Sequence, residues 1–176
     1  MPISKVLRVG IAGYGVVGQR RRHFIDLHEN LQTIAVSDVK LHDGIGEDGV
    51  RTYSDYKGLF DEDLDILFVS LPNYLAPGVT IDGLTKGLHV FCEKPPGRTV
   101  EDVARVQQTA NEYPKLKLKY GFNHRYHASF KEALRLIDAK LLGDVINLRG
   151  VYGKSKIINF DSEWRTQRAQ AGGGIL

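Results

Sequence analysis

A lysine stands where a buried strand should end. Lys94 follows the apolar run Leu88–Cys92 and lies in the motif Glu93-Lys94-Pro95. Open α/β sheets bind their ligands at the carboxyl ends of the strands. An amine at that position can pass a proton to or from a substrate hydroxyl. Lys94 is therefore a candidate catalytic residue in contact with substrate and cofactor, and the alternative is a solvated lysine.

A glycine turn near the N-terminus indicates what Lys94 would face. The segment Gly13-Tyr14-Gly15-Val16-Val17-Gly18 has the spacing of a dinucleotide-binding turn between an apolar strand and a helix. Its glycines permit a tight turn and close approach of a pyrophosphate, while the helix N-terminus offers unpaired N–H groups. We predict that the cofactor contacts Gly13, Tyr14, Gly15, Val16, Val17 and Gly18. The alternative is a glycine-rich turn without a ligand.

An acidic residue supports this prediction. Asp38 ends the next apolar run, 20 positions after Gly18. A carboxylate there can accept from the ribose hydroxyls and would repel a 2′-phosphate, which favours NAD over NADP. Two neighbours leave NADP open, because Lys40 could turn inward and Ser37 could accommodate a phosphate. The other interpretation of Asp38 is a solvated strand end.

The segment Ser70-Leu71-Pro72-Asn73 ends another apolar run, so it should lie at the same edge of the sheet as the glycine turn. Its backbone could line the nicotinamide ribose, which makes Leu71, Pro72 and Asn73 candidate cofactor residues. The alternative is that Pro72 and Asn73 only turn the chain.

The elements that must position these residues alternate between strand-length apolar runs and amphipathic helices. This alternation predicts an α/β fold with a doubly wound parallel sheet of the Rossmann type. We expect strands at 6–12, 33–37, 64–71, 88–92 and 116–122, a short helix near 56–60, and longer helices from the glycine turn to about 28, over 74–86, and from a Thr99 cap to a point before Pro114.

The pattern changes near Asn123. We predict a dinucleotide-binding domain over 1–122 and the start of an α+β substrate and oligomerisation domain over 123–176. In the latter, Phe130, Leu134, Ile137 and Leu141 stripe one helix, and residues 145–152 alternate like a half-exposed strand.

Composition excludes several classes. The 176 residues are 42% hydrophobic and 26% charged, and they contain neither a membrane-length apolar stretch nor a signal peptide, so we expect a cytoplasmic protein. Cys92 is the only cysteine, so no internal disulfide is possible. We expect Cys92 to be a core residue. The net charge of +3 is modest, and Arg20–Arg22 would fan around a helix, which argues against nucleic-acid binding. His124 and His127 lack further ligands, so no metal is predicted.

Taken together, these motifs resemble the Gfo/Idh/MocA family of NAD(P)-dependent oxidoreductases, named after glucose-fructose oxidoreductase, inositol dehydrogenase and rhizopine catabolism. The resemblance spans the chain and is carried by the glycine turn, Ser37-Asp38, Leu71-Pro72-Asn73, Gly87-Leu88-His89-Val90 before Glu93-Lys94-Pro95, and Gly172-Gly173-Gly174-Ile175-Leu176. It implies that Lys94 contacts the reacting sugar hydroxyl, that the Lys94–Pro95 bond is often cis, and that Glu93 lies near the cofactor.

The resemblance also implies that Asn123, Arg125 and Tyr126 lie near a sugar site. Arg165, after Trp164, could pair with a carboxylate or phosphate of the substrate, or it could be structural. We expect hydride transfer between NAD and a secondary hydroxyl of a sugar, sugar nucleotide or cyclitol, with a sugar nucleotide as first choice. The alternative is a non-catalytic dinucleotide-binding module or sensor.

Two departures from the family pattern affect these expectations. Ala76 stands where many relatives have a histidine. The chain also stops at Leu176, before the helix in which the family places a catalytic aspartate and histidine. We therefore expect the first half of a longer enzyme that forms a homo-oligomer when intact.

Overall fold

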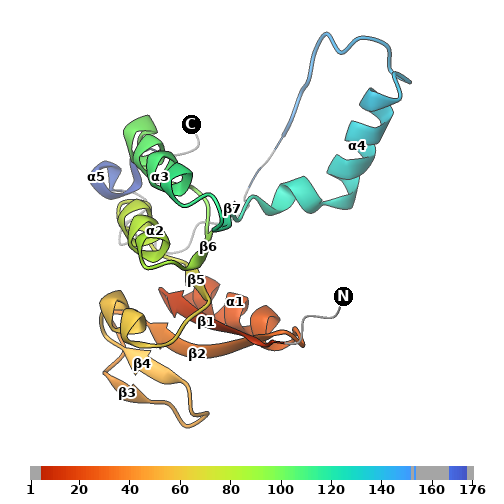
Figure 1. Cartoon of the computed structure of the whole chain (residues 1–176). Coiled ribbons are helices and arrows are strands. Elements are labelled where there is room, and N and C mark those ends of the chain that lie inside the picture. The colour runs from red at the N-terminus through yellow and green to blue at the C-terminus, as the bar shows by residue number, and fades with distance from the viewer. Residues whose placement is uncertain (1–4, 152, 154–166, 174–176) are drawn as a thin grey trace. The chain divides into compact units, whose positions relative to one another are not determined.

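A seven-stranded sheet organises most of the chain in the computed structural model, which describes residues 5–151, 153 and 167–173. Across the sheet the strands are β3 (Gly44–Ile45), β4 (Arg51–Tyr53), β2 (Leu31–Ser37), β1 (Leu7–Ala12), β5 (Ile66–Val69), β6 (His89–Cys92) and β7 (Leu118–Tyr120) (Figure 1). All neighbours pair in parallel except β3 and β4. The doubly wound α/β prediction is confirmed.

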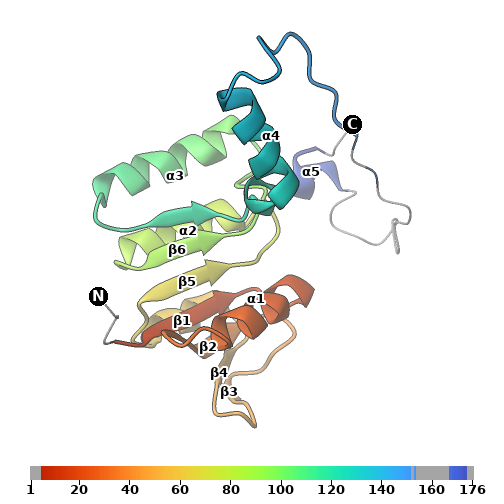
Figure 2. The ribbon, with the colours of Figure 1, turned by 90° about the vertical axis from the view of Figure 1, so that its right-hand side faces the viewer.

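Helices cover both faces of this sheet. They are α1 (Val16–Asp26), the 3₁₀ helix η1 (Tyr56–Asp61), α2 (Ala76–Thr85) and α3 (Val100–Glu112). Helix α1 connects β1 to β2 in one direction across the sheet, whereas α2 and α3 connect β5 to β6 and β6 to β7 in the other direction. Because such crossovers are right-handed, α1 lies on the opposite face of the sheet from α2 and α3 (Figure 2).

The core follows the same division. One buried cluster contains Val9, Ile11 and Ile25 beneath α1. The larger cluster, which includes Leu67, Val79 and Leu84, lies beneath α2 and η1. Because both faces of the central strands are covered, their sequences read as continuous apolar runs.

Local signals fixed the ends of several helices. Gly87 has φ of +82° directly after the last turn of α2, a left-handed conformation that glycine commonly supplies at the C-terminal end of a helix. Pro77 lies in the first turn of α2, where its missing N–H costs no helical hydrogen bond. The Thr99 side chain accepts from the Asp102 backbone N at 3.2 Å, so α3 begins at its predicted cap.

The chain divides into two compact units. The first comprises residues up to Gly121 and the segment from Trp164 onward, and it holds the sheet. The second, Phe122–Glu163, contains η2 (Asn123–Tyr126) and α4 (Ala128–Asp138). The sequence placed everything after residue 122 in a second domain, whereas α5 (Arg168–Ala171) packs within the first unit.

The structure differs from the sequence-based expectations in two segments. No strand was predicted between 37 and 64, yet Gly44 and Ile45 pair with Thr52 and Arg51 as an antiparallel edge. The predicted strand at 145–152 is wrong for its described residues, since none of residues 145–151 is in a strand. Alternation provides one apolar face, but a strand also needs a partner for its backbone groups, and that segment has none among the described residues.

Among the described residues, no helix combines the length and the apolar character that crossing a membrane requires.

Candidate active site

Four strand ends meet at one edge of the sheet. Strand β1 lies between β2 and β5, at the point where the chain reverses its direction across the sheet, and open α/β sheets bind ligands at this point. We call Gly13–Gly18 with Asp38 the turn side of this edge. Ser70–Asn73 and Glu93–Arg98, which follow β5 and β6, form the lysine side. The predicted cofactor residues therefore all lie at one edge.

The turn side is shaped by backbone contacts. Gly13 has φ of +91°, and its N–H donates to the Ser37 carbonyl at 2.9 Å. A Cβ at Gly13 would lie 2.5 Å from the Ser70 carbonyl oxygen, and one at Gly18 would lie 2.0 Å from the Gly13 carbonyl oxygen. Both positions exclude a side chain because the fold fills the space.

Gly15 differs from the other two glycines. A Cβ there would meet nothing within 4 Å, and Gly15 caps α1 without any side-chain hydrogen bond to the helix N–H groups. An uncapped helix N-terminus beside open space can accept an anion such as a pyrophosphate. The turn therefore fits the phosphates of a dinucleotide.

Asp38 is locked onto this turn. Its carboxylate accepts from the Tyr14 backbone N at 3.0 Å and from the Lys40 backbone N at 3.1 Å. A carboxylate has about four acceptor positions, so two remain for ribose hydroxyls. Ser37 is only 2% exposed, which corrects the idea that it could receive a phosphate, and Lys40 is exposed.

The Tyr14 side chain is also held. Its hydroxyl accepts from Arg22 Nη1 at 2.9 Å, and Arg22 pairs with Asp26 and, through Nη2 at 2.6 Å, with Asp48. Burial alone would lower the pKa of Arg22. The hydrogen bonds to the Tyr14 hydroxyl, Asp48 and Asp26 outweigh burial and raise that pKa above its ordinary value. The network joins the glycine turn to the loop between β3 and β4.

Glu93 and Lys94 begin the loop after β6. The Glu93 side chain is 13% exposed, and its Oε1 accepts from Arg21 Nε at 2.6 Å and also pairs with Arg21 Nη2. Lys94 is exposed, and its bond to Pro95 is cis. The Lys94 ammonium has no ion pair with a residue that the structure describes.

The Asn73 side chain contacts α5. It is buried, and its Nδ2 donates to the Ala171 carbonyl at 2.8 Å, while Arg98 Nη1 donates to the Ala169 carbonyl at the same distance. These donors cap the C-terminal carbonyls of α5, which lack partners inside the helix. The Asn73 side chain therefore ties α5 to the lysine side, while Leu71 and Pro72 remain half-buried at the edge.

The remaining described substrate candidates belong to the second unit. Asn123, Arg125 and Tyr126 form η2 in the second unit, where all three are exposed and the Arg125 N–H donates to the Phe122 carbonyl. Tyr126 faces the Lys131 ammonium at 6.0 Å from the ring centroid. Arg165 falls outside the described residues.

Sequence reasoning expected Arg20–Arg22 to fan around a helix and assigned no role to Arg21. Residues three, four and seven positions apart share a helix face. Gly18 packs against Gly13 and Ile25 is buried, so Arg21 and Arg22 between them must lean toward the sheet. Arg20 is exposed. The position of Gly18 was the available signal.

Two other features can be set apart from this edge. Burial raises the pKa of the Cys92 thiol to about 11, which confirms a core cysteine that stays protonated.

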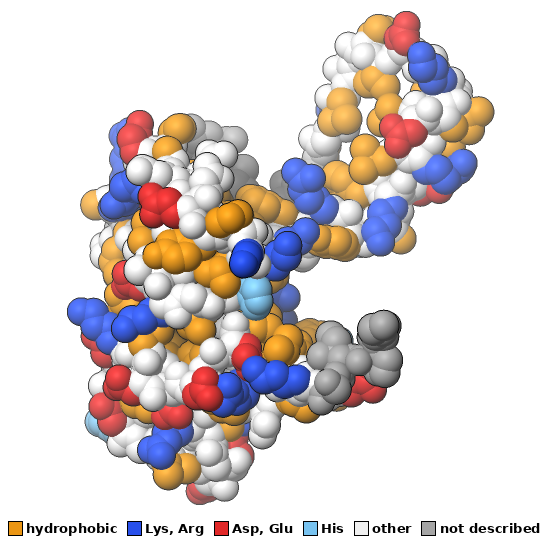
Figure 3. Space-filling view, viewed as in Figure 1, with side chains coloured by type: hydrophobic (Ala, Val, Ile, Leu, Met, Phe, Trp, Pro, Cys, Tyr) orange, Lys and Arg blue, Asp and Glu red, His pale blue; other side chains and the backbone are white. Residues whose placement is uncertain are grey.

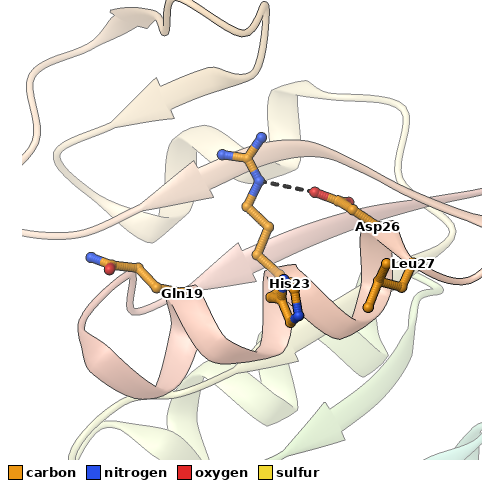
Figure 4. A pocket seen from close by; sticks show the side chains of 5 residues that line it. Gln19, His23, Asp26 and Leu27 are labelled. Carbon is orange, nitrogen blue, oxygen red and sulfur yellow. Dashed lines mark hydrogen bonds and ion pairs between the residues drawn. The ribbon is translucent and has the colours of Figure 1, made fainter.

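A shallow hollow follows α1 and is lined by Gln19, Arg22, His23, Asp26 and Leu27, with the Arg22–Asp26 ion pair drawn as a dashed line (Figure 4). None of the predicted site residues lines that hollow. The described residues contain no cluster of potential metal ligands.

Comparison with known proteins points to one family. Residues 7–122 match the sequence model of GFO_IDH_MocA, described as an oxidoreductase family with an NAD-binding Rossmann fold. The chain is 24% identical over 170 residues to inositol 2-dehydrogenase of Salmonella typhimurium, covering 93% of this chain and 50% of that protein. The chain thus spans about half the length of the curated relatives it matches.

Solved structures agree with this match. The crystal structure of myo-inositol 2-dehydrogenase from Lactobacillus plantarum aligns with a TM-score of 0.71 and 29% identity, over 81% of this chain and 44% of that one. The scyllo-inositol dehydrogenase of Lactobacillus casei, solved with NAD(H) and scyllo-inositol, aligns with a TM-score of 0.71 and 26% identity, over 80% of this chain and 43% of that one.

Proposed function

This chain belongs to the Gfo/Idh/MocA family of oxidoreductases with an NAD-binding Rossmann fold, and we propose that the whole protein oxidises or forms a secondary alcohol on a sugar, sugar nucleotide or cyclitol. One observation carries the proposal. The glycine turn, Asp38 and Lys94 all stand at the carboxyl ends of parallel strands around one reversal point of the sheet.

The turn side would hold NAD. Backbone N–H groups at the start of α1 would bind the pyrophosphate, and Asp38 would accept from the adenine ribose hydroxyls. When bound, the nicotinamide ring supplies the hydride acceptor or donor. Asp38 favours NAD over NADP because its carboxylate is fixed by two backbone N–H groups and would repel a 2′-phosphate.

Lys94 would bind the reacting hydroxyl through a charge-assisted hydrogen bond and stabilise the alkoxide that forms as the proton leaves. Its exposed ammonium, which has no ion pair with any residue the structure describes, is available for that contact. The residue that finally accepts the proton is expected beyond Leu176, by resemblance to the family. Glu93 would lie beside the cofactor.

Substrate recognition would use residues of the second unit. We assign Asn123, Arg125 and Tyr126 to the sugar site, and Arg165 to an acidic group of the substrate if it has one. The first compounds to test are cyclitols and sugars without a nucleotide. They are suggested by two relatives, the inositol 2-dehydrogenase of Salmonella typhimurium and the levoglucosan dehydrogenase of Pseudarthrobacter phenanthrenivorans. Nucleotide-linked sugars, the first choice from the sequence, form the second group.

The test uses the full-length protein, with any sequence that follows Leu176 retained. The absorbance of NADH formed from NAD is measured with a panel of cyclitols, sugars and sugar nucleotides. Lys94→Ala should lower turnover by about 10²–10⁴-fold, the usual contribution of a positioned proton-handling group, while NADH binding is retained. Lys57→Ala, at an exposed lysine of η1, is the matched control. Undiminished turnover in Lys94→Ala would remove Lys94 from the catalytic role.

The cofactor assignment has its own test. Asp38→Ala should weaken NADH binding and narrow the preference over NADPH, because the acceptor for the ribose hydroxyls and the charge that repels a phosphate both disappear. Fluorescence titration with each reduced cofactor measures this. An unchanged ratio of the two dissociation constants would show that Asp38 does not choose the cofactor.

The relatives named above are dehydrogenases, so they lend no support to the alternative of a non-catalytic dinucleotide-binding module. A cytoplasmic location, a homo-oligomeric state and the absence of nucleic-acid binding remain predictions from the sequence.

A further inference from the structure

An arginine of the cofactor helix holds the acidic neighbour of Lys94. Arg21 lies in the second turn of α1, and its Nε donates to Glu93 Oε1 at 2.6 Å, while Nη2 pairs with the same oxygen. The guanidinium carbon lies 5.0 Å from the centroid of the Phe91 ring, which stacks on Phe68 at 4.8 Å between centroids. A planar cation on an aromatic ring keeps its position with little loss of freedom.

The Glu93 carboxylate is enclosed on its other side as well. Oε2 accepts from the Lys94 backbone N at 3.3 Å, and a Cβ at Gly121 would lie 2.8 Å from the same oxygen. The carboxylate thus fills the space beside Gly121 and accepts from the backbone of Lys94, at the start of the segment Glu93–Arg98. A carboxylate with only 13% of its side chain exposed needs a cation nearby, because burial of an unpaired charge is costly.

Arg21 is the cation observed on this carboxylate, and the sequence places Lys94 beside it. Arg21 approaches from α1, and Lys94 is the next residue in the chain. If Arg21 were absent, the unpaired Glu93 carboxylate would attract the ammonium of Lys94, the adjacent residue in the chain. Lys94 would then pair with Glu93, and its N–H donors would no longer be available to a substrate hydroxyl.

We propose that Arg21 is a positioning residue for Lys94, because it occupies the Glu93 carboxylate and so keeps that carboxylate from pairing with the Lys94 ammonium. The catalytic meaning of this inference rests on the proposed function. The contact between Arg21 and Glu93 does not, and a test without turnover can therefore examine it.

The test measures how fast the Lys94 amine is acylated by acetic anhydride in the full-length protein without cofactor. Peptide mass spectrometry gives the rate relative to that of exposed Lys57 in the same sample. Arg21→Ala should slow Lys94 acylation about two- to fivefold, because the amine reacts more slowly while it is paired with Glu93 and an exposed ion pair is only partly occupied. Glu93→Gln added to Arg21→Ala should restore the original rate, because the competing carboxylate is gone.

Arg20→Ala is the matched control, since Arg20 is the exposed neighbour on the same helix, and it should leave Lys94 acylation unchanged. If Arg21→Ala does not fold, Arg21→Gln removes the charge and retains much of the packing on Phe91. Unchanged acylation in the Arg21 variant would overturn the proposal. So would slowing that persists after Glu93→Gln, because the cause would then be general disorder.

A second readout applies to a substrate that the full-length enzyme turns over. Arg21→Ala should lower kcat by about two- to fivefold through lost free Lys94 while the NADH dissociation constant stays within about twofold. Arg21→Lys should recover part of kcat, since it retains a cation for Glu93. An increase in the NADH dissociation constant without change in kcat would assign Arg21 to cofactor binding instead. If no substrate is turned over, the proposed function fails, whereas the acylation result still decides the role of Arg21.

Discussion

The turn side and the lysine side of the sheet edge are held in different ways. On the turn side, Gly13 bonds to Ser37 backbone to backbone, and Asp38 accepts from backbone N–H groups. On the lysine side, side chains make the ties. Glu93 is held by Arg21, 72 positions away, and Asn73 reaches Ala171, 98 positions away.

This difference has a physical consequence. Backbone groups do not titrate and cannot change rotamer, so the close contacts of Gly13 and Gly18 on the turn side should depend chiefly on space. The lysine side relies on ionisable side chains and should respond to charge and pH. Substitutions that add volume therefore test the first, and substitutions that remove charge test the second.

The largest expected effect is on the turn side. Gly18→Ala would place a Cβ 2.0 Å from the Gly13 carbonyl oxygen, so the turn must shift. We expect the free energy of unfolding to fall by about 1–3 kcal/mol or more, as overpacking does. Urea denaturation measures this.

Gly78→Ala in α2 is the control, because a Cβ there meets nothing within 4 Å. It should raise the free energy of unfolding by up to about 1 kcal/mol through better helix propensity. Equal effects of the two alanines would refute the idea that space at Gly18 governs the turn side.

A smaller effect is expected where Asp102 of α3 holds Arg98, the last residue of the lysine side. Asp102 is buried and would be harder to ionise for that reason alone, but hydrogen bonds from the Arg98 N–H and from Arg105 outweigh burial and hold its pKa below the usual range. Asp102→Asn should lower the free energy of unfolding at neutral pH by about 1–2 kcal/mol.

The sign of the pH dependence follows from the lowered pKa of Asp102. Its stabilisation is complete above the pKa of the unfolded chain and is lost as the pH falls through the lower pKa of the folded state. The difference between wild type and Asp102→Asn should therefore shrink as the pH drops below about 4. Urea denaturation over a pH series measures it, and a difference that stays constant down to the lowest pH would show that charge does not hold this side.

The smallest effect on stability is expected at Gly15, where a Cβ meets nothing within 4 Å and φ is −73°. Gly15→Ala should leave the free energy of unfolding within about 0.5 kcal/mol of wild type. It should nevertheless weaken NADH binding, because the methyl group enters the space through which a pyrophosphate approaches the backbone. Unaltered NADH titration would mean that the open space at Gly15 is not the phosphate site.

Much of the first unit followed from the sequence because its signals are local. The strand-length apolar runs, the Thr99 cap and Gly87 all lie within the elements that they define. The edge hairpin of β3 and β4 was not predicted, since strands of two and three residues carry no readable periodicity. The alternation at 145–151 produced no strand, because that pattern encodes a face but not a partner.

The second unit shows the same limit. The predicted helix is present as α4, but it ends at Asp138, so Leu141 of the predicted stripe lies outside it. Phe130 and Leu134 are on α4, yet they are 54% and 55% exposed. Hydrophobic side chains stand among charged ones on the surface of this unit (Figure 3). A stripe predicts a helix with an apolar face, whereas burial requires a neighbour that the stripe does not specify.

The sequence by itself determined the fold class, the glycine turn, Asp38 and the position of Lys94 at a strand end, because periodicity and glycine spacing act over a few residues. Only the tertiary structure decided that Arg21 holds Glu93 and that Asn73 binds Ala171. Those partners lie 72 and 98 positions apart, and the sheet brings them together only after its strands have been ordered. Their pairing depends on the space between elements, which no local pattern records.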